Sequence, residues 1–340
     1  MNTSLAQAYQ ALLNDQPKLR IRDAARLLNS SEAELLQTQE GVTRLRPEIA
    51  ELLKAMPSLG KTMVLTRNEH CVHEKTGTWK PPQIGRHASL ALGDIDLRMF
   101  LSGWRHVLAQ SRQAGARALH SIQFFNAHGE AILKVYAQDE DLGPYQALVQ
   151  RFSAPELPSI VAEPKAAPQP VVQAPVDVEA LSADWAKLQD THDFYGLLRK
   201  YKVQRLLAFE LCPAFAKKVE VDMDAFLRAA AELGLPIMVF VSNPGNIQIH
   251  TGPVKKILTM GDWVNVMDPS FNLHLNTQGI SQIWRVRKPT SDGDVNSLEI
   301  YAQDGSTIAM LFGARKEGKH ELAAWRGLLA KLAPCPWDAA

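Results

Sequence analysis

The sequence predicts an α+β fold made of two tandem homologous halves, each with a large antiparallel β-sheet and helices at its ends. The first observation is an internal duplication. Residues 121–138 (SIQFFNAHGEAILKVYAQ) align without a gap with residues 297–314 (SLEIYAQDGSTIAMLFGA), at an offset of 297 − 121 = 176. The second is a proline-rich segment between the copies, and the third is an order of elements that both copies share. A period this long indicates a duplicated domain, because solenoid units run about 20–50 residues.

The duplication extends beyond this segment and places a boundary between its copies. Asp96-Leu97-Arg98 aligns with Asn272-Leu273-His274 at the same offset, and Asn68 aligns with Asn243 at an offset of 175 (243 − 68). Six of the 20 prolines lie between residues 155 and 175. Such a composition is typical of a semi-rigid linker. We therefore expect a first repeat over residues 1–154, a linker over 155–180 and a second repeat over 181–340.

Each half shows the same succession of patterns. Apolar residues at helical spacing predict an opening helical segment and a second helix. Short runs of β-forming residues predict strands, and a polar residue followed by glycine predicts a hairpin turn. A further helical pattern closes each half. Helices at the ends with strands between them favour antiparallel sheets over alternating βαβ units. In chain order these elements lie at 8–29, 46–56, 62–68, 128–129 and 143–152 in the first half, and at 184–201, 223–234, 237–243, 304–305 and 320–332 in the second.

Composition and targeting signals narrow the class of protein. Charged residues are 21% of the 340 residues and the formal net charge is +1, so no global field attracts nucleic acid. The N-terminus lacks a signal-peptide pattern, and no apolar run approaches the roughly 20 residues that span a bilayer. The three cysteines are far apart and form no CxxC pair. We expect a cytoplasmic protein without membrane insertion and without a nucleic-acid partner.

One histidine has an unusual sequence context. The pattern predicts a helix over residues 183–200, and His192 lies on its apolar stripe together with Trp185, Leu188, Tyr195 and Leu198. A core histidine bonded to a backbone carbonyl is one interpretation. The other is an axial ligand to an iron atom in a flat apolar cofactor, a task for which imidazole is a usual ligand.

The duplication makes any such site asymmetric. Arg22 aligns with His192, so the first copy lacks the imidazole, whereas Arg98 aligns with His274. Alternation along GDIDLRMF (93–100) places Arg98 on one face of a strand together with Asp96 and Phe100. Arg98 either forms a surface ion pair or faces a pocket, where it could orient a polar ligand.

Three further cations lie near the ends of predicted elements. Guanidinium and ammonium groups at such positions are either solvated or grip carboxylates. These cations are Arg205, Lys288 and Arg315.

Long segments of the chain together resemble a known family. The sequence is similar to the bacterial hemin-degrading factor or cytoplasmic heme-trafficking family of the HemS/ChuS/PhuS type. The segments that carry the resemblance are LTRNEHCVHEKTG (65–77), GDIDLRMF (93–100), LQDTHDFYGLLRKY (188–201), DWVNVMDPSFNLHL (262–275), VRKPTSDGDVNSLEIYAQDG (286–305) and LFGARKEGKHELAAWR (311–326).

The resemblance implies a heme protein of two similar halves with a heme cleft between them. It implies His192 as the proximal axial ligand of the heme iron, Arg98 as the distal, catalytic residue and Phe100 as part of the distal wall. It implies Arg205, Lys288 and Arg315 on the propionate side. Met310 and Phe312 depart from the family pattern, which has Gln and Tyr there, so the resemblance implies no hydrogen bond to heme from these two positions.

The expected function is therefore heme handling for iron acquisition. The protein receives imported heme and either degrades it, with an external electron donor, or delivers it as a non-catalytic chaperone to a separate heme oxygenase. An inner-membrane heme importer is a further expected partner. A regulatory protein is a third alternative, because residues 21–36 resemble a helix-turn-helix, but no basic recognition face accompanies them.

Overall fold

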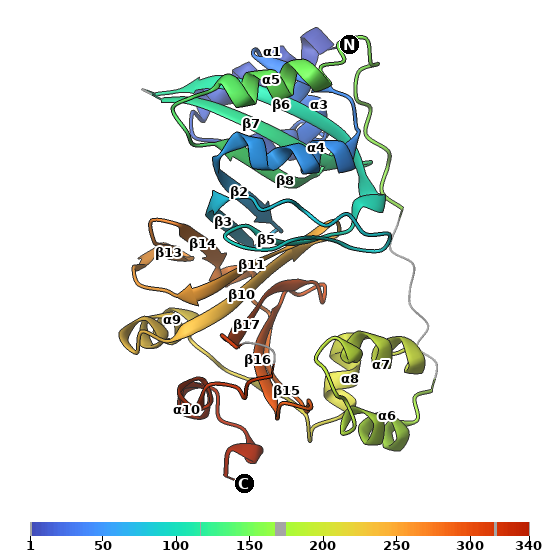
Figure 1. The fold of residues 1–340 in the computed structure, drawn as a ribbon, viewed down its shortest axis with the longest axis vertical. Coiled ribbons are helices and arrows are strands. Elements are labelled where there is room, and N and C mark those ends of the chain that lie inside the picture. Colours follow the sequence, from blue (N-terminus) through green and yellow to red (C-terminus); the bar gives the residue numbers. More distant parts are fainter. Residues whose placement is uncertain (1, 116, 167–174, 316–317, 340) are drawn as a thin grey trace. The chain divides into compact units, whose positions relative to one another are not determined.

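The computed structural model describes residues 2–115, 117–166, 175–315 and 318–339 (Figure 1). Two compact units make up the chain. Unit 1 comprises Met1–Arg67, Glu74–Ala167 and Asn243–Gln248, and unit 2 comprises Asn68–His73, Pro168–Ser242 and Ile249–Ala340. Each unit therefore includes one short segment from the other half of the sequence. The unit boundary passes through strands β3 (Cys71–Thr78) and β11 (Asn246–Pro253).

In unit 1, antiparallel strands follow one another in the order β1-β6-β7-β8-β2, and β4 pairs with β5 as a hairpin. The strands are β1 (Val42–Leu45), β2 (Lys61–Arg67), β4 (Ser89–Ala91), β5 (Asp96–Met99), β6 (Trp104–Ala114), β7 (Arg117–Asn126) and β8 (Ala131–Ala137). The helices are α1 (Asn2–Asp15), α2 (Ile21–Leu27), α3 (Glu32–Gln37), α4 (Ile49–Ala55) and α5 (Gly143–Phe152), with 3-10 turns η1 (Met56–Leu59) and η2 (Leu101–Gly103).

Unit 2 repeats this arrangement with strands in the order β9-β15-β16-β17-β10, and β12, β13 and β14 form a meander. The strands are β9 (Ala216–Val219), β10 (Pro236–Asn243), β12 (Ile257–Met260), β13 (Trp263–Met267), β14 (Phe271–Asn276), β15 (Gln282–Lys288), β16 (Val295–Tyr301) and β17 (Thr307–Gly313). The helices are α6 (Val178–Trp185), α7 (Asp193–Tyr201), α8 (Arg205–Leu211), α9 (Met223–Glu232) and α10 (Ala323–Leu332), with 3-10 turns η3 (Thr277–Gly279) and η4 (Pro336–Ala339). The shared strand order confirms the predicted pair of homologous α+β halves.

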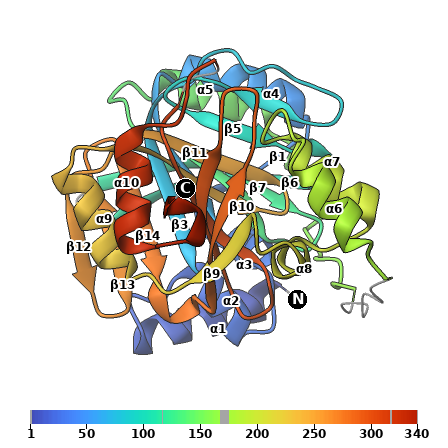
Figure 2. The same cartoon turned by 90° about the horizontal axis from the view of Figure 1, so that it is seen from below.

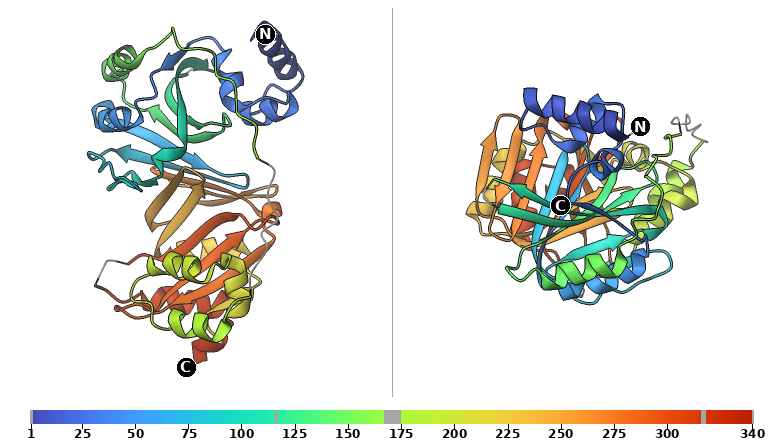
Figure 3. Two further views of the ribbon diagram at one scale, coloured as in Figure 1. Left: turned by 90° about the vertical axis from the view of Figure 1, so that its right-hand side faces the viewer. Right: turned by 90° about the horizontal axis from the view of Figure 1, so that it is seen from above.

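Helices cover both faces of the sheet in each unit. In unit 1, α4 and α5 pack over one core, while α1, α2 and α3 cover the opposite face (Figure 3). In unit 2, α9 and α10 pack over the largest core, and α6, α7 and α8 form a separate aromatic core against the other face (Figure 2). Both predicted hairpin turns are present, with Gly129 at φ +69° and Gly305 at φ +80°. Both angles lie in the left-handed region, which glycine adopts at little cost.

Two helices that the sequence predicts as continuous are broken. The predicted helix over 8–29 is divided into α1 and α2, with Pro17 in the connecting turn, because proline lacks the N–H that a helix interior requires. The predicted helix over 183–200 is divided into α6 and α7. The Asp193 carboxylate accepts hydrogen bonds from the backbone N–H groups of Gln189 (3.3 Å) and Asp190 (3.0 Å). Such local side-chain bonds compete with helical ones and end the helix.

The first part of the predicted linker is hydrogen-bonded to unit 1. Gln37 exchanges two hydrogen bonds with the backbone of Ile160, at 2.9 and 2.7 Å, and the N–H of Glu163 donates to the carbonyl of Ala127 at 2.9 Å. Residues 167–174 of the predicted linker lie outside the described residues. The repeat and linker boundaries at residues 154 and 180 stay a prediction.

Matched asparagines stabilise the short segment that each unit receives from the other half of the sequence, Asn68–His73 in unit 2 and Asn243–Gln248 in unit 1. In unit 2, the Asn68 amide donates to the carbonyls of Ser242 (3.1 Å) and Ile308 (2.8 Å). In unit 1, the Asn243 amide donates to the carbonyls of Arg67 (3.2 Å) and Ile132 (2.8 Å). The partners match through the duplication, since 132 + 176 = 308 and 67 + 175 = 242. Each asparagine thus plays the same structural part in its own unit.

Candidate functional site

His192 lies in the turn between α6 and α7, directly before the first residue of α7. Its side chain is 92% exposed, so it is not a core histidine, and the structure corrects the prediction of an apolar helix face. The imidazole Nδ1 lies 2.5 Å from Oδ1 of Asp190, and the backbone N–H of His192 donates to the same oxygen at 2.7 Å. The backbone bond from His192, followed by its side-chain bond, holds the pKa of Asp190 below its ordinary value. When Nδ1 carries the proton, Nε2 offers its lone pair to an incoming ligand.

A buried ionic cluster lies on the sheet of unit 2 beneath α7 and α8. The Arg205 guanidinium donates two bonds of 2.7 Å to the carboxylate of Glu299, and Lys288 donates to it at 2.9 Å. Tyr301 and Ser297 donate to the same carboxylate, at 2.6 and 3.1 Å. Burial alone would raise the pKa of Glu299, but the charges of Arg205 and Lys288 hold it far below its usual range. With Glu299 ionised, the two cations and one anion leave a net charge of +1.

These cations also contact aromatic rings. The guanidinium of Arg205 and the ammonium of Lys288 each lie 5.1 Å from the ring centre of Phe194, two residues beyond His192. Lys288 lies 5.9 Å from the ring centre of Phe312, which in turn contacts the ring of Phe240 at 5.1 Å. The cluster of Arg205, Lys288 and Glu299 therefore borders an apolar area that includes Phe312 and Phe240.

This apolar area consists of four half-buried side chains on β10 and β17. The register places Met238 directly opposite Phe312 and Phe240 directly opposite Met310. All four alternate with buried neighbours, so they share the face of the sheet that carries Glu299. A partly exposed apolar patch beside a cationic cluster suits a ligand with an apolar body and anionic substituents.

Arg315 follows β17 and lies near the His192 turn. Its Nη1 is 3.8 Å from a carboxylate oxygen of Asp292, and its positive charge contributes to the lowered pKa of Asp190. The N–H of Ser291 donates to the carbonyl of Gln189 at 2.9 Å, which ties the loop after β15 to the turn before α7. The structure thus brings His192, Arg205, Lys288 and Arg315 onto one side of unit 2.

Arg98 and Phe100 belong to unit 1. The predicted alternation is confirmed, because Leu97 and Met99 are buried whereas Arg98 and Phe100 are half-buried. Arg98 forms an ion pair with Asp96, two residues earlier on β5. Burial raises the pKa of Asp96, and Arg98 opposes that shift. A site that joins Arg98 to the residues of unit 2 stays a prediction.

Sequence reasoning missed Asp190, Glu299, Met238 and Phe240, and it named Met310 and Phe312 only as departures from the family pattern. Asp190 stands two residues before His192, a spacing at which an aspartate can accept the backbone N–H of the later residue. Glu299 interrupts a run of β-forming residues in SLEIY, and a carboxylate on a buried strand requires cationic partners. The apolar residues of this face could have been found by pairing the alternating patterns of residues 237–243 and 307–313 as neighbouring strands.

The fold and these residues define a class of protein with two homologous α+β units, in which the second unit presents an exposed imidazole beside a cationic and apolar wall. The family model described as the haemin-degrading HemS.ChuX domain matches residues 29–152 and 202–332. This chain belongs to that family.

Full-length relatives support the assignment. The chain is 36% identical to the hemin transport protein HmuS of Yersinia pestis over 339 residues, covering 98% of each chain, and 35% identical to the hemin transport protein HemS of Yersinia enterocolitica over 342 residues, also covering 98% of each. Among solved structures it is similar to holo-PhuS, a heme-binding protein from Pseudomonas aeruginosa (TM-score 0.93, 44% identity, covering 98% of this chain and 99% of that one). It is also similar to ChuS, a heme-degrading enzyme of Escherichia coli O157:H7 (TM-score 0.91, 37% identity, covering 98% and 100%).

Within the described part of the chain, none of the helices combines the length and the apolar composition that crossing a membrane requires.

Proposed function

We propose that this chain is a cytoplasmic heme-binding protein that receives imported heme and leads it towards iron release. The observation that carries the proposal is the exposed His192 imidazole, whose Nδ1 is held by Asp190 and whose Nε2 is free to bind iron. The names of the relatives agree with this, since they describe hemin transport, heme binding and heme degradation.

The surroundings of His192 fit heme in three respects. Iron-binding histidines commonly donate their second nitrogen to a carboxylate, which fixes the ring and strengthens the ligand, and Asp190 is placed to accept it. The apolar face formed by Met238, Phe240, Met310 and Phe312 suits an apolar macrocycle. The cations nearby suit its propionate carboxylates. When bound, heme supplies the iron and its redox chemistry, while the protein supplies ligand, orientation and charge.

The cations have different parts in this proposal. The Nε and Nη2 atoms of Arg205 bind Glu299, which leaves Nη1 for a propionate, and the side chain is 29% exposed. Arg315 offers a second guanidinium on the side of the His192 turn. Lys288 is buried against Glu299 and contributes its positive charge rather than a direct contact.

Arg98 would hold a small ligand of the heme by hydrogen bonds, and Phe100 would line the same space. Arg98 Nη1 binds Asp96 and the carbonyl of Leu97, which orients the guanidinium and leaves its remaining N–H groups to donate to a small iron ligand. We include Arg98 as the distal, catalytic residue and Phe100 as part of the distal wall.

Degradation of heme is the first form of this function. It would open the macrocycle to a linear tetrapyrrole, with dioxygen as the oxidant and electrons from a donor. That donor would be external, because the sequence has no flavin or nicotinamide motif. The second form is a chaperone that takes heme from an inner-membrane importer and delivers it to a separate heme oxygenase. The high exposure of His192 favours this second form, since an accessible ligand allows transfer.

A single-turnover experiment separates the two forms. Holo-protein is mixed with an electron donor in the presence of catalase, and the Soret band and the products are followed. Conversion of heme to one defined tetrapyrrole supports degradation. Loss of heme only when catalase is omitted reflects free peroxide and supports the chaperone. Failure of the protein to bind hemin at all would contradict the proposal as a whole.

A further inference from the structure

A cavity in unit 2 is lined by residues of β15, β16, α10 and η4, and buried polar side chains form part of its wall. Its volume is about 540 Å³. Among its lining residues, Arg285 on β15, Asn296 on β16 and Glu321 before α10 are 1%, 4% and 5% exposed. Successive residues of a strand point to opposite faces, so Asn296 lies on the other face of β16 from Glu299. The cavity is therefore separated by the sheet from the cluster around Glu299.

Glu321 is a buried acid without a paired cation. Its carboxylate accepts a bond of 2.6 Å from the backbone N–H of Asn296 and one of 3.0 Å from the side-chain amide of the same residue. No ion pair within the described residues includes Glu321. Burial raises its pKa to about 7, which the bonds from Asn296 and the charges of Arg326 and Arg285 oppose only in part. Each carboxylate oxygen can accept a second bond, so an ammonium group in the cavity would supply the missing cation.

Asn296 adds a second acceptor at the same place. Its Nδ2 donates to Glu321, but its Oδ1 is buried with no hydrogen-bond partner among the described residues. In unit 1 the residue that matches Asn296 is His120 (296 − 176), and the residue that matches Arg287 is Ser111 (287 − 176). His120 Nδ1 and Ser111 Oγ lie 2.9 Å apart, so this pair satisfies itself. In unit 2 the fold leaves an acceptor for which it provides no donor.

The charges of the lining leave one arginine beside this acid. Four lining residues form two ion pairs, Arg285 with Asp338 and Arg287 with Asp294. Arg326 is exposed, donates to the backbone carbonyl of Glu321 at 3.1 Å and forms no ion pair within the described residues. The remaining titratable group of the lining is the exposed His320. A ligand with an ammonium and a carboxylate close together matches Glu321 and Arg326, whereas a purely anionic or purely cationic ligand would be repelled by one of them.

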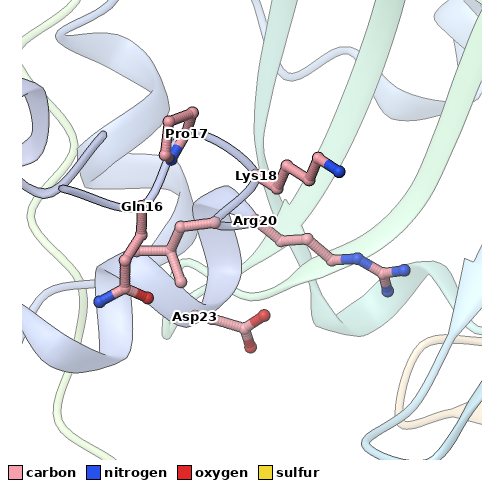
Figure 4. Close-up of a pocket in the computed structure, with 6 residues that line it drawn as sticks. Gln16, Pro17, Lys18, Arg20 and Asp23 are labelled. Atoms are coloured by element: carbon pink, nitrogen blue, oxygen red, sulfur yellow. The ribbon is translucent and has the colours of Figure 1, made fainter. Parts of the chain in front are cut away.

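The cavity that Figure 4 shows in unit 1 lacks these features. It has a volume of about 510 Å³ and is lined by the turn between α1 and α2. The charged residues of its lining are Lys18, Arg20 and Asp23, and none of them is buried. Exposed charges are solvated and gain little from an ion pair. The buried acid and the buried amide thus favour the cavity of unit 2 as a ligand site.

We propose that the cavity of unit 2 is a second, iron-independent binding site for a small zwitterion, a free amino acid. Its ammonium group binds the Glu321 carboxylate and Oδ1 of Asn296, and its carboxylate binds the Arg326 guanidinium. The volume lies within the roughly 300–1,000 Å³ of small-molecule sites, which leaves room for an amino-acid side chain. A metal ion is a poorer match, because the described part of the chain contains no group of three or more His, Cys, Asp or Glu residues that could hold one.

Calorimetric titration of the full-length, heme-free protein tests this site, with the standard protein amino acids as separate probes. We expect saturable binding of at least one of them. Its N-acetyl derivative lacks the ammonium group and its amide lacks the carboxylate, so each should bind about tenfold more weakly or worse. Equal affinity for either derivative would overturn the proposed ligand class. The absence of any amino acid with a Kd below about 10 mM would overturn the site.

Two variants test whether the amino acid occupies the cavity. Glu321→Gln removes the buried charge and Arg326→Gln removes the exposed guanidinium, and each should raise the Kd of the bound amino acid about tenfold or more. Lys331→Gln, which changes an exposed cation of α10 outside the lining, should leave that Kd unchanged. If Glu321→Gln does not fold, Arg326→Gln still tests the site, because it changes an exposed side chain. An unchanged Kd in the cavity variants would overturn the proposal.

The derivatives and the variants together separate direct contacts from a loosened fold. The amide should bind the parent and Arg326→Gln equally, and the N-acetyl derivative should bind the parent and Glu321→Gln equally, because each pair lacks the same contact. Weaker binding of both derivatives to both variants would overturn the assigned contacts. Hemin affinity should equal that of the parent in both variants, since the cavity and Glu299 lie on opposite faces of the sheet. A parallel loss of hemin binding would overturn the separation of the two sites.

Discussion

The two units share a backbone plan but place their buried charges differently. In unit 2 the buried acid Glu299 on β16 holds Arg205 and Lys288. At the matching position of unit 1, Gln123 donates to Ser121 at 3.0 Å, whereas Glu299 accepts from Ser297, the residue that matches Ser121, at 3.1 Å. The buried acid of unit 1 is instead Glu32 on α3, paired with Lys134.

This difference shows what duplication preserves. Strand order, hairpin turns and the two asparagines are nearly the same in both units, because they depend on backbone hydrogen bonds and glycine conformations. Charged groups are free to move between elements so long as each buried charge gains a partner. The face under α6–α8 has become partly apolar with an imidazole at its edge, whereas the face under α1–α3 has become cationic.

Of the variants that test this difference between the units, replacement of the imidazole should have the largest effect on hemin affinity. His192→Ala removes the iron ligand that only unit 2 has, so hemin affinity should fall by more than the roughly 10–100-fold that outer-shell residues of metal sites contribute. The ferric absorption spectrum during hemin titration checks this. His87→Ala, an exposed histidine of unit 1, is the matched control. An unchanged spectrum and affinity in His192→Ala would refute the ligand assignment.

Glu299 and Glu32, the buried acids of these two ion clusters, offer a reciprocal pair of variants. Glu299→Gln leaves Arg205 and Lys288 without an anion, and Glu32→Gln leaves Lys134 without one. Each should lower the free energy of unfolding by about 3–5 kcal/mol, measured by denaturant titration. Only Glu299→Gln should also weaken hemin binding, because its cations border the apolar face near His192. Equal hemin affinity in the two variants would argue against a role for that cluster in binding.

The ion cluster also predicts a pH dependence. The pKa of folded Glu299 is held far below its unfolded value, so the folded state binds fewer protons than the unfolded state in mild acid. Its contribution to stability is therefore fully present above the unfolded pKa, near 4.5, and is lost as the pH falls below that value towards the folded pKa. In Glu299→Gln, the free energy of unfolding should fall less steeply as the pH drops below this value. A pH dependence as steep as the parent's would mean that Glu299 is not its cause.

Much of the fold was predictable because local patterns determine it. The turn glycines, the closing helix over 143–152 and the alternation around Arg98 all depend on residues that are close in sequence. The break before α7 was not predicted, because the spacing of apolar residues through His192 fits a helix, and only the Asp193 bonds show why it ends there. Glu299 was missed for a different reason. Its partner Arg205 is 94 residues away, and no spacing rule links them.

Asp190 tests how far the exposed imidazole depends on its neighbour. Asp190→Asn keeps an oxygen that can accept from the backbone N–H of His192 but removes the negative charge that makes the imidazole a stronger ligand. We expect hemin affinity to fall about 10-fold, less than in His192→Ala. Asp304→Asn, at the exposed turn between β16 and β17, is the matched control. A decrease as large as that of His192→Ala would mean that Asp190 shapes the whole turn and not only the imidazole.

Arg98 should have the smallest effect on affinity and the most specific effect on the spectrum. Arg98→Ala leaves His192 and the cations of unit 2 in place, so hemin should bind with nearly the affinity of the parent. The N–H groups that Arg98 would offer to a small iron ligand are lost, so the pH titration of the ferric spectrum should shift, because the balance between water and hydroxide on the iron changes. Asp96→Asn is the informative companion, since it frees Arg98 from its ion pair without removing the guanidinium. If Arg98 contacts the ligand, Asp96→Asn should shift the titration less than Arg98→Ala does. If both variants titrate like the parent, Arg98 is only the partner of Asp96 on β5, and the iron chemistry of this chain belongs to unit 2 alone.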